Sequence, residues 1–302
     1  MMTHKAPPLF SVVIPTYNHG KYLGRCLQSV LDQTYTNWEV IIVDNHSTDD
    51  TEDVVNSFTD ERFTYVKVHN NGIIAVSRNV GIKAANGEWI AFLDSDDWWT
   101  SNKLNVCLNY INNTVDLLYH DLQIIPRRSW PFSNSLKGRQ LKYPVLIDLL
   151  VGGNAISNSS VVVRKYLLDE INGINEDREL MAAEDYNTWL RIARLTDQFV
   201  YLPQILGSYF VHSQAISKRD MSTPVSCAVS EFLCSINLKQ KNLVEARVRY
   251  SKARFCFSYH CADDSRLDLL FSLRYGPLSI RVKSLIMLTI TLLSTSQKVR
   301  SH

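Results

Sequence analysis

The first half of the chain alternates short apolar runs with segments whose apolar residues recur at helical spacing. Four runs rich in β-branched residues predict strands: FSVVI (10–14), EVIIV (39–43), FTYVKV (63–68) and WIAFL (89–93). Three of these runs are apolar on both faces, which is typical of parallel strands covered by helices. Residues 22–31 place their apolar side chains on one face of a helix. This alternation predicts an α/β fold with right-handed crossovers.

The rest of the chain continues the alternation less regularly. Further strands are predicted at 115–120, 159–165, 199–203 and 207–212, and further helices at 75–87, 104–111 and 183–195. Residues 126–142 are polar and basic, which predicts a mobile loop. Beyond residue 218 the spacing is helical, and we find no motif there that carries chemistry.

Polar residues follow three of the predicted strands at the point where each strand ends. In open α/β sheets, ligands bind beyond the carboxyl ends of the strands. The residues at these ends are Pro15, Thr16, Tyr17 and Asn18 after the first strand, Asp44 after the second, and Asp94, Ser95 and Asp96 after the fourth. Any one of them could cap a helix, but three such strand ends favour a ligand site.

Asp94 and Asp96 are two residues apart, so in extended geometry their carboxylates point to the same side. Like charges that are aimed together repel unless a cation lies between them. Mg²⁺ or Mn²⁺ takes oxygen ligands and commonly joins carboxylates to substrate phosphates. The alternative is a solvated acidic turn before a helix, with Asp97 as the N-cap.

Composition narrows the class of protein. The 302 residues carry 32 Lys and Arg against 30 Asp and Glu, a net charge of +2, which disfavours a dedicated nucleic-acid binder. The six cysteines show no zinc spacing and are interpreted as reduced thiols of a cytoplasmic protein. We see neither a signal peptide nor an apolar run long enough to span a membrane.

Residues 284–295 form the longest apolar stretch, and it has basic neighbours on both sides. That combination suits an interfacial helix on the inner face of an anionic membrane. A helix packed on the protein's own surface explains the pattern equally well.

Several of these motifs occur together and in order. SVVIPTYNHGKYLGRCLQSVLDQTYTNWEVIIVDNHSTDDT (11–51), SRNVGIKAANGEWIAFLDSDDWW (77–99) and EDYNTWLRIA (184–193) closely resemble the family 2 glycosyltransferases. The resemblance covers 10–99 and 154–217, fades at 126–142 and is absent after 218. It implies a GT-A-type, Rossmann-like, mixed but mainly parallel sheet flanked by helices. The implied catalytic domain is 1–217, with a nucleotide-binding part at 8–125 and an acceptor part at 126–217, followed by a helical C-terminal appendage at 218–302.

The resemblance implies roles for the residues at the strand ends. Pro15, Tyr17 and Asp44 would line the uridine pocket, and Arg78 would lie near the base or the diphosphate. Asp94 would lie close to the ribose and the metal, Asp96 would be the firmest metal ligand, and His212 would be a further metal ligand or diphosphate contact. One departure is at 44–46, where Asp-Asn-His stands in place of the family's usual Asp-Asp-Gly.

An inverting transfer needs a carboxylate that takes the proton of the acceptor hydroxyl. By resemblance this base is Asp185, with Glu184 as support, although acidic residues at a helix start can also be simple caps. A helix N-terminus is expected to lower the pKa of such a carboxylate. Trp98 is a candidate wall of the sugar pocket, and Asn154 is a candidate contact to the donor sugar or the acceptor.

The resemblance implies an inverting hexosyl- or N-acetylhexosaminyltransferase that uses a UDP-sugar and Mn²⁺ or Mg²⁺. The expected acceptor is a carbohydrate or a lipid-linked glycan in bacterial surface-polysaccharide biosynthesis. Two alternatives stay open: a sugar nucleotidyltransferase, and a non-catalytic nucleotide-sugar-binding protein of the same fold. A dehydrogenase is disfavoured because no G-x-G-x-x-G follows the first strand.

Overall fold

The computed structural model describes residues 10–127, 133–212, 220–258 and 265–300. Its nine-stranded sheet has the order β3-β2-β1-β4-β8-β6-β9-β5, and β7 pairs with β6. The strands are β1 (Phe10–Thr16), β2 (Trp38–Asp44), β3 (Phe63–Lys67), β4 (Trp89–Phe92), β5 (Trp98–Trp99), β6 (Leu117–Ile125), β7 (Ser135–Leu136), β8 (Val162–Arg164) and β9 (Phe199–Phe210). Strands β3, β2, β1 and β4 are mutually parallel, and β8 introduces antiparallel pairing. The predicted mixed α/β fold is confirmed.

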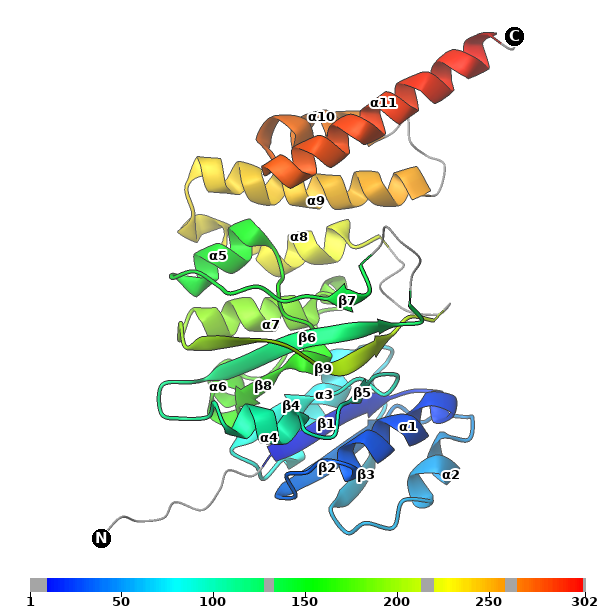
Figure 1. Cartoon of the computed structure of the whole chain (residues 1–302), viewed down its shortest axis with the longest axis vertical. Helices are drawn as coiled ribbons and strands as arrows, with labels where there is room; N and C mark the ends of the chain where they lie inside the picture. The colour runs from blue at the N-terminus through cyan, green and yellow to red at the C-terminus, as the bar shows by residue number, and fades with distance from the viewer. Residues whose placement is uncertain (1–9, 128–132, 213–219, 259–264, 301–302) are drawn as a thin grey trace.

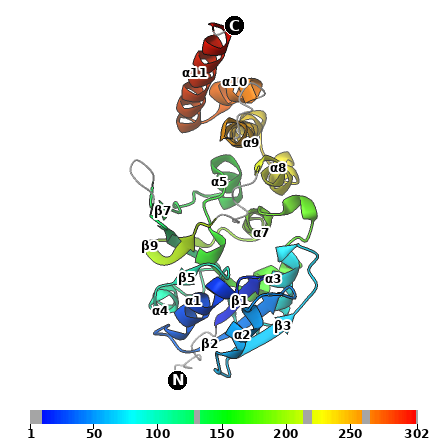
Figure 2. The same cartoon turned by 90° about the vertical axis from the view of Figure 1, so that its right-hand side faces the viewer.

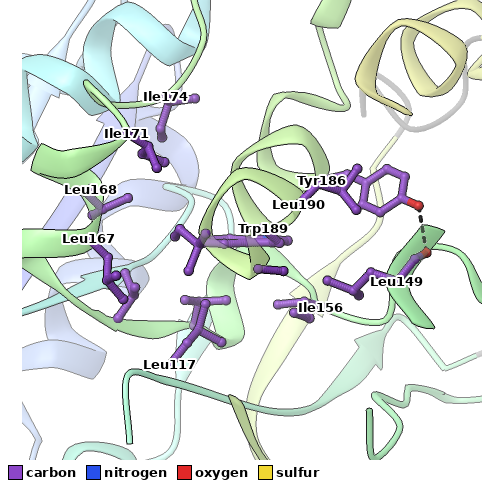
Figure 3. Packing of buried hydrophobic residues seen from close by; sticks show 14 of the residues in the cluster. Leu117, Leu149, Ile156, Leu167, Leu168, Ile171, Ile174, Tyr186, Trp189 and Leu190 are labelled. Atoms are coloured by element: carbon purple, nitrogen blue, oxygen red, sulfur yellow. Dashed lines mark hydrogen bonds between the residues drawn. The ribbon is translucent and has the colours of Figure 1, made fainter. Parts of the chain in front are cut away.

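Helices cover both faces of this sheet (Figure 1). The helices of the sheet region are α1 (Gly20–Leu31), α2 (Thr51–Asn56), α3 (Ile74–Ala84), α4 (Lys103–Leu108), α5 (Val145–Gly152), α6 (Lys165–Glu170) and α7 (Glu184–Ala193). Neighbouring residues of β1 point to opposite faces, so Val12 packs with α1 and α4 while Val13 packs with α3 and α7. Trp189 of α7 lies in the same buried apolar cluster as Val13. In this region the hydroxyl of Tyr186 donates to the carbonyl of Leu149 at 2.8 Å (Figure 3).

The C-terminal helices are stacked in layers on the side of the sheet region that carries α5 and α7. They are α8 (Ser222–Ser230), α9 (Leu238–Ser258), α10 (Arg266–Tyr275) and α11 (Leu278–Arg300). Helices α8 and α9 lie over α5 and α7, and α10 and α11 lie beyond α9 (Figures 1 and 2). Arg247 Nε of α9 donates to the carbonyl oxygen of Val151 at 2.7 Å, which fastens the region to the end of α5. In the described part of the chain, no helix is both long and apolar enough to cross a bilayer.

Several sequence-based boundaries were wrong. The two late strands form one strand, β9, whose pairing with β6 shifts register near Asp121, so the irregularity breaks the apolar pattern without ending the strand. Helix α3 ends at Ala84, before the predicted stop at Gly87. The predicted loop at 126–142 contains β7, while its residues 128–132 lie outside the described ranges. The predicted boundary between the catalytic domain and the appendage, at 217 and 218, also lies outside them.

Candidate active site

The polar strand ends of β1, β2 and β4 meet at one edge of the sheet. Because β1 pairs in parallel with both β2 and β4, all three strands end at the same edge of the sheet. The loops after them are joined by hydrogen bonds. The amide of Asn18 donates to Ser47 Oγ at 2.8 Å, and His19 Nδ1 and Ser95 Oγ are 2.8 Å apart. Residues from three distant segments therefore form one polar site.

Asp44 is fully buried at the end of β2. Its carboxylate accepts hydrogen bonds from Ser47 Oγ at 2.5 Å and from the hydroxyl of Tyr65 at 2.7 Å. His46 follows with a φ of 52°, the left-handed region that glycine enters readily, at the position where the family usually has Gly. Tyr17 is 52% exposed, so its ring is open to a ligand above the strand ends.

Asp94 follows β4 and is held from three sides. Its backbone amide donates to Ser159 Oγ at 3.1 Å. Its carboxylate oxygen Oδ1 accepts from Arg78 Nη2 at 2.7 Å and from Asn158 Nδ2 at 3.0 Å. The orientation of this carboxylate is therefore fixed by α3 and by the turn before β8.

Asp96 faces two histidines. Its carboxylate oxygen Oδ2 lies 2.9 Å from Nε2 of His212, which is two residues beyond the end of β9. The rings of His212 and His19 pack edge to face, with centroids 5.8 Å apart. Burial and the neighbouring Asp94 raise the pKa of Asp96 above its usual value, so negative charge is crowded at this point.

A divalent cation would fit the donor chemistry of this cluster. Asp94, Asp96 and His212 supply oxygen and imidazole donors, and the excess negative charge is what a cation compensates. Within the described ranges, no three His, Cys, Asp or Glu side chains are arranged as a finished metal-binding group. Two of the donors contact each other directly, so a cation would have to separate Asp96 from His212.

Asp97, which follows Asp96 directly, has a different role. It is 1% exposed, and its Oδ1 accepts from the backbone amide of Phe210 at 2.9 Å. It is not a helix cap, since α4 begins at Lys103 with Asn102 as its N-cap. Asp97 ties the turn after β4 to the end of β9, which carries His212 nearby.

Arg78 connects the sheet edge to helix α7. It lies in α3, where the missing side chain of Gly81 lets the helix approach Val13 of β1. Its Nη1 donates to Glu184 Oε1 at 2.6 Å while Nη2 contacts Asp94. Burial alone would lower the pKa of Arg78, but the two carboxylates outweigh it and the pKa lies above its usual value. Asp94 and Glu184 are thus held by one buried guanidinium.

Asp185 is the second residue of α7 and lies next to this ion-pair network. Burial first, and then Glu184, raise its pKa to about 7, while Arg78 acts in the opposite direction. The expected lowering by the helix N-terminus is therefore wrong, because desolvation and a like charge outweigh the helix dipole. A carboxyl with a pKa near neutrality is suited to proton transfer.

Trp98 and Trp99, which follow Asp97, differ in their surroundings. Trp99 is 3% exposed and donates from its ring nitrogen to the carbonyl of Ser159 at 2.8 Å. Trp98 is half-buried, and the guanidinium carbon of Arg25 lies 3.4 Å from its ring centroid. Trp98 is therefore the less buried of the pair, with Arg25 covering one face of its ring.

Three residues of the site, Asn158, His19 and Arg25, were not predicted from the sequence. The predicted residue Asn154 has its hydrogen bond within its own turn. Asn154 is exposed, and its side chain accepts from the amide of Ile156 at 3.0 Å, within its own turn. Asn158, four residues later, is the asparagine that reaches Asp94. His19 and Arg25 were also missed. The only available signal for His19 was its position directly after the first strand end, which does not reveal a side-chain direction.

Four buried polar atoms around the site have no hydrogen-bond partner among the described residues. They are Thr16 Oγ1, Arg78 Nε, Glu184 Oε2 and His212 Nδ1. Buried polar groups are normally paired, so a cluster of unpaired ones indicates a place that a ligand or water completes.

Comparisons with known proteins agree with this geometry. The family model for "Glycosyl transferase family 2" matches residues 11–158. A UDP-Glc:α-D-GlcNAc-diphosphoundecaprenol β-1,3-glucosyltransferase of Escherichia coli is 31% identical over 188 residues, which cover 62% of this chain and 70% of that protein. A putative teichuronic acid biosynthesis glycosyltransferase of Bacillus subtilis is 29% identical over 214 residues, which cover 70% of this chain and 82% of that protein.

Among solved structures, a mannosyltransferase from Pyrobaculum calidifontis in complex with GDP-Man and Mn²⁺ has the same fold. It matches with a TM-score of 0.61 at 18% identity, over 99% of this chain and 82% of that one. The fold likeness, the family match and the identity to the E. coli enzyme agree with the acidic strand ends described above. The chain belongs to glycosyltransferase family 2.

Proposed function

We propose that this chain is an inverting, metal-dependent glycosyltransferase that moves a hexosyl or N-acetylhexosaminyl group from a UDP-sugar to a carbohydrate or lipid-linked glycan. Asp185 is the base that takes the proton of the attacking hydroxyl, and Glu184 supports it. The nucleotide occupies the edge formed by Pro15, Thr16, Tyr17, Asn18 and Asp44.

The observation that carries this proposal is the bridge made by Arg78. Its two bonds, 2.7 Å to Asp94 and 2.6 Å to Glu184, join the end of β4 to the start of α7. A donor with its diphosphate at Asp94 and Asp96 would have its sugar directed toward α7. Asp185, with a pKa raised to about 7, is then on the acceptor side of that sugar, as an inverting displacement requires.

Asp94, Asp96 and His212 would hold the Mn²⁺ or Mg²⁺. When bound, the cation neutralises the diphosphate as it leaves. Asn158 and Arg78 keep the Asp94 carboxylate in one orientation, so the protein itself sets the direction of one ligand. Ser95 is held by His19 and keeps the turn between the two aspartates in shape.

Relatives support the setting. The E. coli enzyme is named for a UDP-Glc donor and a diphosphoundecaprenol acceptor, and the B. subtilis relative for teichuronic acid biosynthesis. We infer a comparable role in bacterial surface-polysaccharide assembly. In this proposal the enzyme works on the cytoplasmic side and touches the inner face of the membrane through its C-terminal region.

The test is a screen of UDP-sugars with Mn²⁺ or Mg²⁺, with and without glycan acceptors. We expect release of UDP that depends on acceptor and metal and is lost in Asp96→Ala and Asp185→Ala. Asp169→Ala, which removes an exposed carboxylate of α6, is the matched control and should leave the rate unchanged. Release of pyrophosphate would favour a nucleotidyltransferase. Binding without turnover for every donor and acceptor would favour the non-catalytic alternative.

A further inference from the structure

Helix α11 exposes several large apolar side chains, while its packed side holds two hydroxyl residues beside Ile280, which is 8% exposed. The side packed against the other C-terminal helices includes Ser284 and Thr291, which are 0% and 2% exposed. The solvent side carries five large apolar residues, Leu278 (77% exposed), Val282 (49%), Leu285 (54%), Ile286 (53%) and Ile290 (47%), together with the exposed residues Ser279 and Thr289. Large exposed apolar side chains that lie together on one surface mark an interaction site.

These five residues lie along one side of the helix, with Ser279 and Thr289 between them. At 3.6 residues per turn they fall within an arc of about 140° and extend along about 18 Å of the helix. Arg281 and Lys283 are both exposed, and the same spacing places them at the two margins of the arc. Helix α10, which packs against α11, has two further exposed leucines, Leu267 and Leu270, at 76% and 52%. An apolar stripe with cations along its margins is the pattern of a helix that lies in a membrane interface.

The charge of the region decides between a membrane and a second copy of the chain. No Asp or Glu follows Asp268, whereas Lys or Arg occurs at 274, 281, 283, 298 and 300. In residues 238–302 basic residues outnumber acidic ones three to one, whereas in the preceding 237 residues acidic residues are in excess. Two such surfaces brought together would repel each other, but anionic lipid headgroups would attract them.

We infer that the exposed face of α11, together with the exposed leucines of α10, docks on an anionic lipid surface, with α11 lying in the plane of the interface. This deepens the membrane part of the proposed function by naming the surface and the lipid charge, and it rests on that proposal for its setting only. The chemistry of the sheet edge does not enter it.

The test is sedimentation of the full chain with vesicles of phosphatidylglycerol and phosphatidylcholine in equal parts, and with vesicles of phosphatidylcholine alone. We expect binding to the anionic vesicles that weakens as salt is added. The double variant Leu285→Gln/Ile286→Gln should lower the partition coefficient at least about tenfold, and Arg281→Glu/Lys283→Glu should do so by a similar factor. Leu195→Gln is the matched control, since Leu195 is 53% exposed on the sheet region; it should bind like the unaltered chain.

The inference is overturned if the unaltered chain sediments with neither vesicle, or if the α11 variants bind as it does. It is also overturned if light scattering shows a dimer that Leu285→Gln/Ile286→Gln converts to a monomer without any vesicle binding. UDP release with a water-soluble acceptor should be the same in the α11 variants as in the unaltered chain. A failed vesicle experiment with intact turnover would therefore leave the proposed function standing.

Discussion

The sheet edge and the α10–α11 layer depart from ordinary burial in opposite directions. At the sheet edge charged groups are buried: Arg78 and Glu184 are 3% and 6% exposed. In α11 five large apolar side chains are exposed and two hydroxyl residues are buried. A fold that only had to be stable would do neither, because buried charges cost free energy and exposed leucines gain none.

The difference teaches what each region must contact. Buried charges that are paired through one guanidinium hold reacting groups in fixed positions, which suits chemistry on a polar ligand. Exposed apolar residues with basic margins suit a surface that is itself apolar with an anionic rim. The excess of acidic residues in the first 237 residues and of basic ones afterwards follows the same division.

The largest expected effect is a loss of turnover when a residue near the sheet edge is changed. Asp185→Asn removes the proposed base while keeping its shape, and should lower kcat by roughly 10² to 10⁴-fold. The measurement is acceptor-dependent UDP release at saturating substrate. A rate within tenfold of the unaltered enzyme would show that another group takes the proton.

Arg78→Met should be the most destabilising change in the network. It leaves the carboxylates of Asp94 and Glu184 without their cation, and the expected loss in the free energy of unfolding is about 3–5 kcal/mol. Denaturant unfolding measures it. Lys165→Met, which breaks an exposed pair with Asp169 at 3.3 Å, is the control and should cost no more than about 0.5 kcal/mol. Equal losses in the two variants would contradict a buried network.

The pH dependence of turnover tests the environment of Asp185. A base must be ionised, and its pKa is raised to about 7, so kcat/KM should fall about tenfold per unit as the pH drops below about 7. The stability effect has the opposite sign. Between the unfolded pKa and the folded one the native state binds more protons, so ionisation of Asp185 destabilises the fold as the pH rises toward about 7.

Asp185→Asn should remove this pH-dependent loss of stability, so the gain in unfolding free energy over the unaltered chain should grow between acidic and neutral pH. Parallel stability profiles for the two proteins would mean that the carboxyl is not desolvated.

The smallest effect is expected on the free energy of unfolding when an exposed residue of α11 is changed. Leu285→Gln should change the free energy of unfolding in solution by less than about 0.5 kcal/mol, because this side chain is 54% exposed. Leu269→Ala, at a residue of α10 that is 0% exposed, should cost about 2–5 kcal/mol. A large loss for Leu285→Gln would mean that the exposed stripe supports the fold itself.

Local pattern was enough for the first parallel strands and for the acidic residues at the ends of two of them. FSVVI, EVIIV and WIAFL are short, bounded and rich in β-branched residues, and each is a strand in the structure. The two halves of β9 were predicted separately because a register shift interrupts the apolar pattern. The contact between Asn158 and Asp94 could not be predicted, because spacing along the chain carries no information about which amide turns toward Asp94.

The sequence by itself determined that this is an α/β chain with polar residues at the ends of three predicted strands, since hydrophobic periodicity is a local property. Only the tertiary structure decided that Arg78 joins Asp94 to Glu184, that Asp97 fastens β9, and that the pKa of Asp185 rises instead of falling. It also decided which side of α11 faces solvent. Each of these depends on contacts between segments far apart along the chain, and such contacts leave no trace in the spacing of residues.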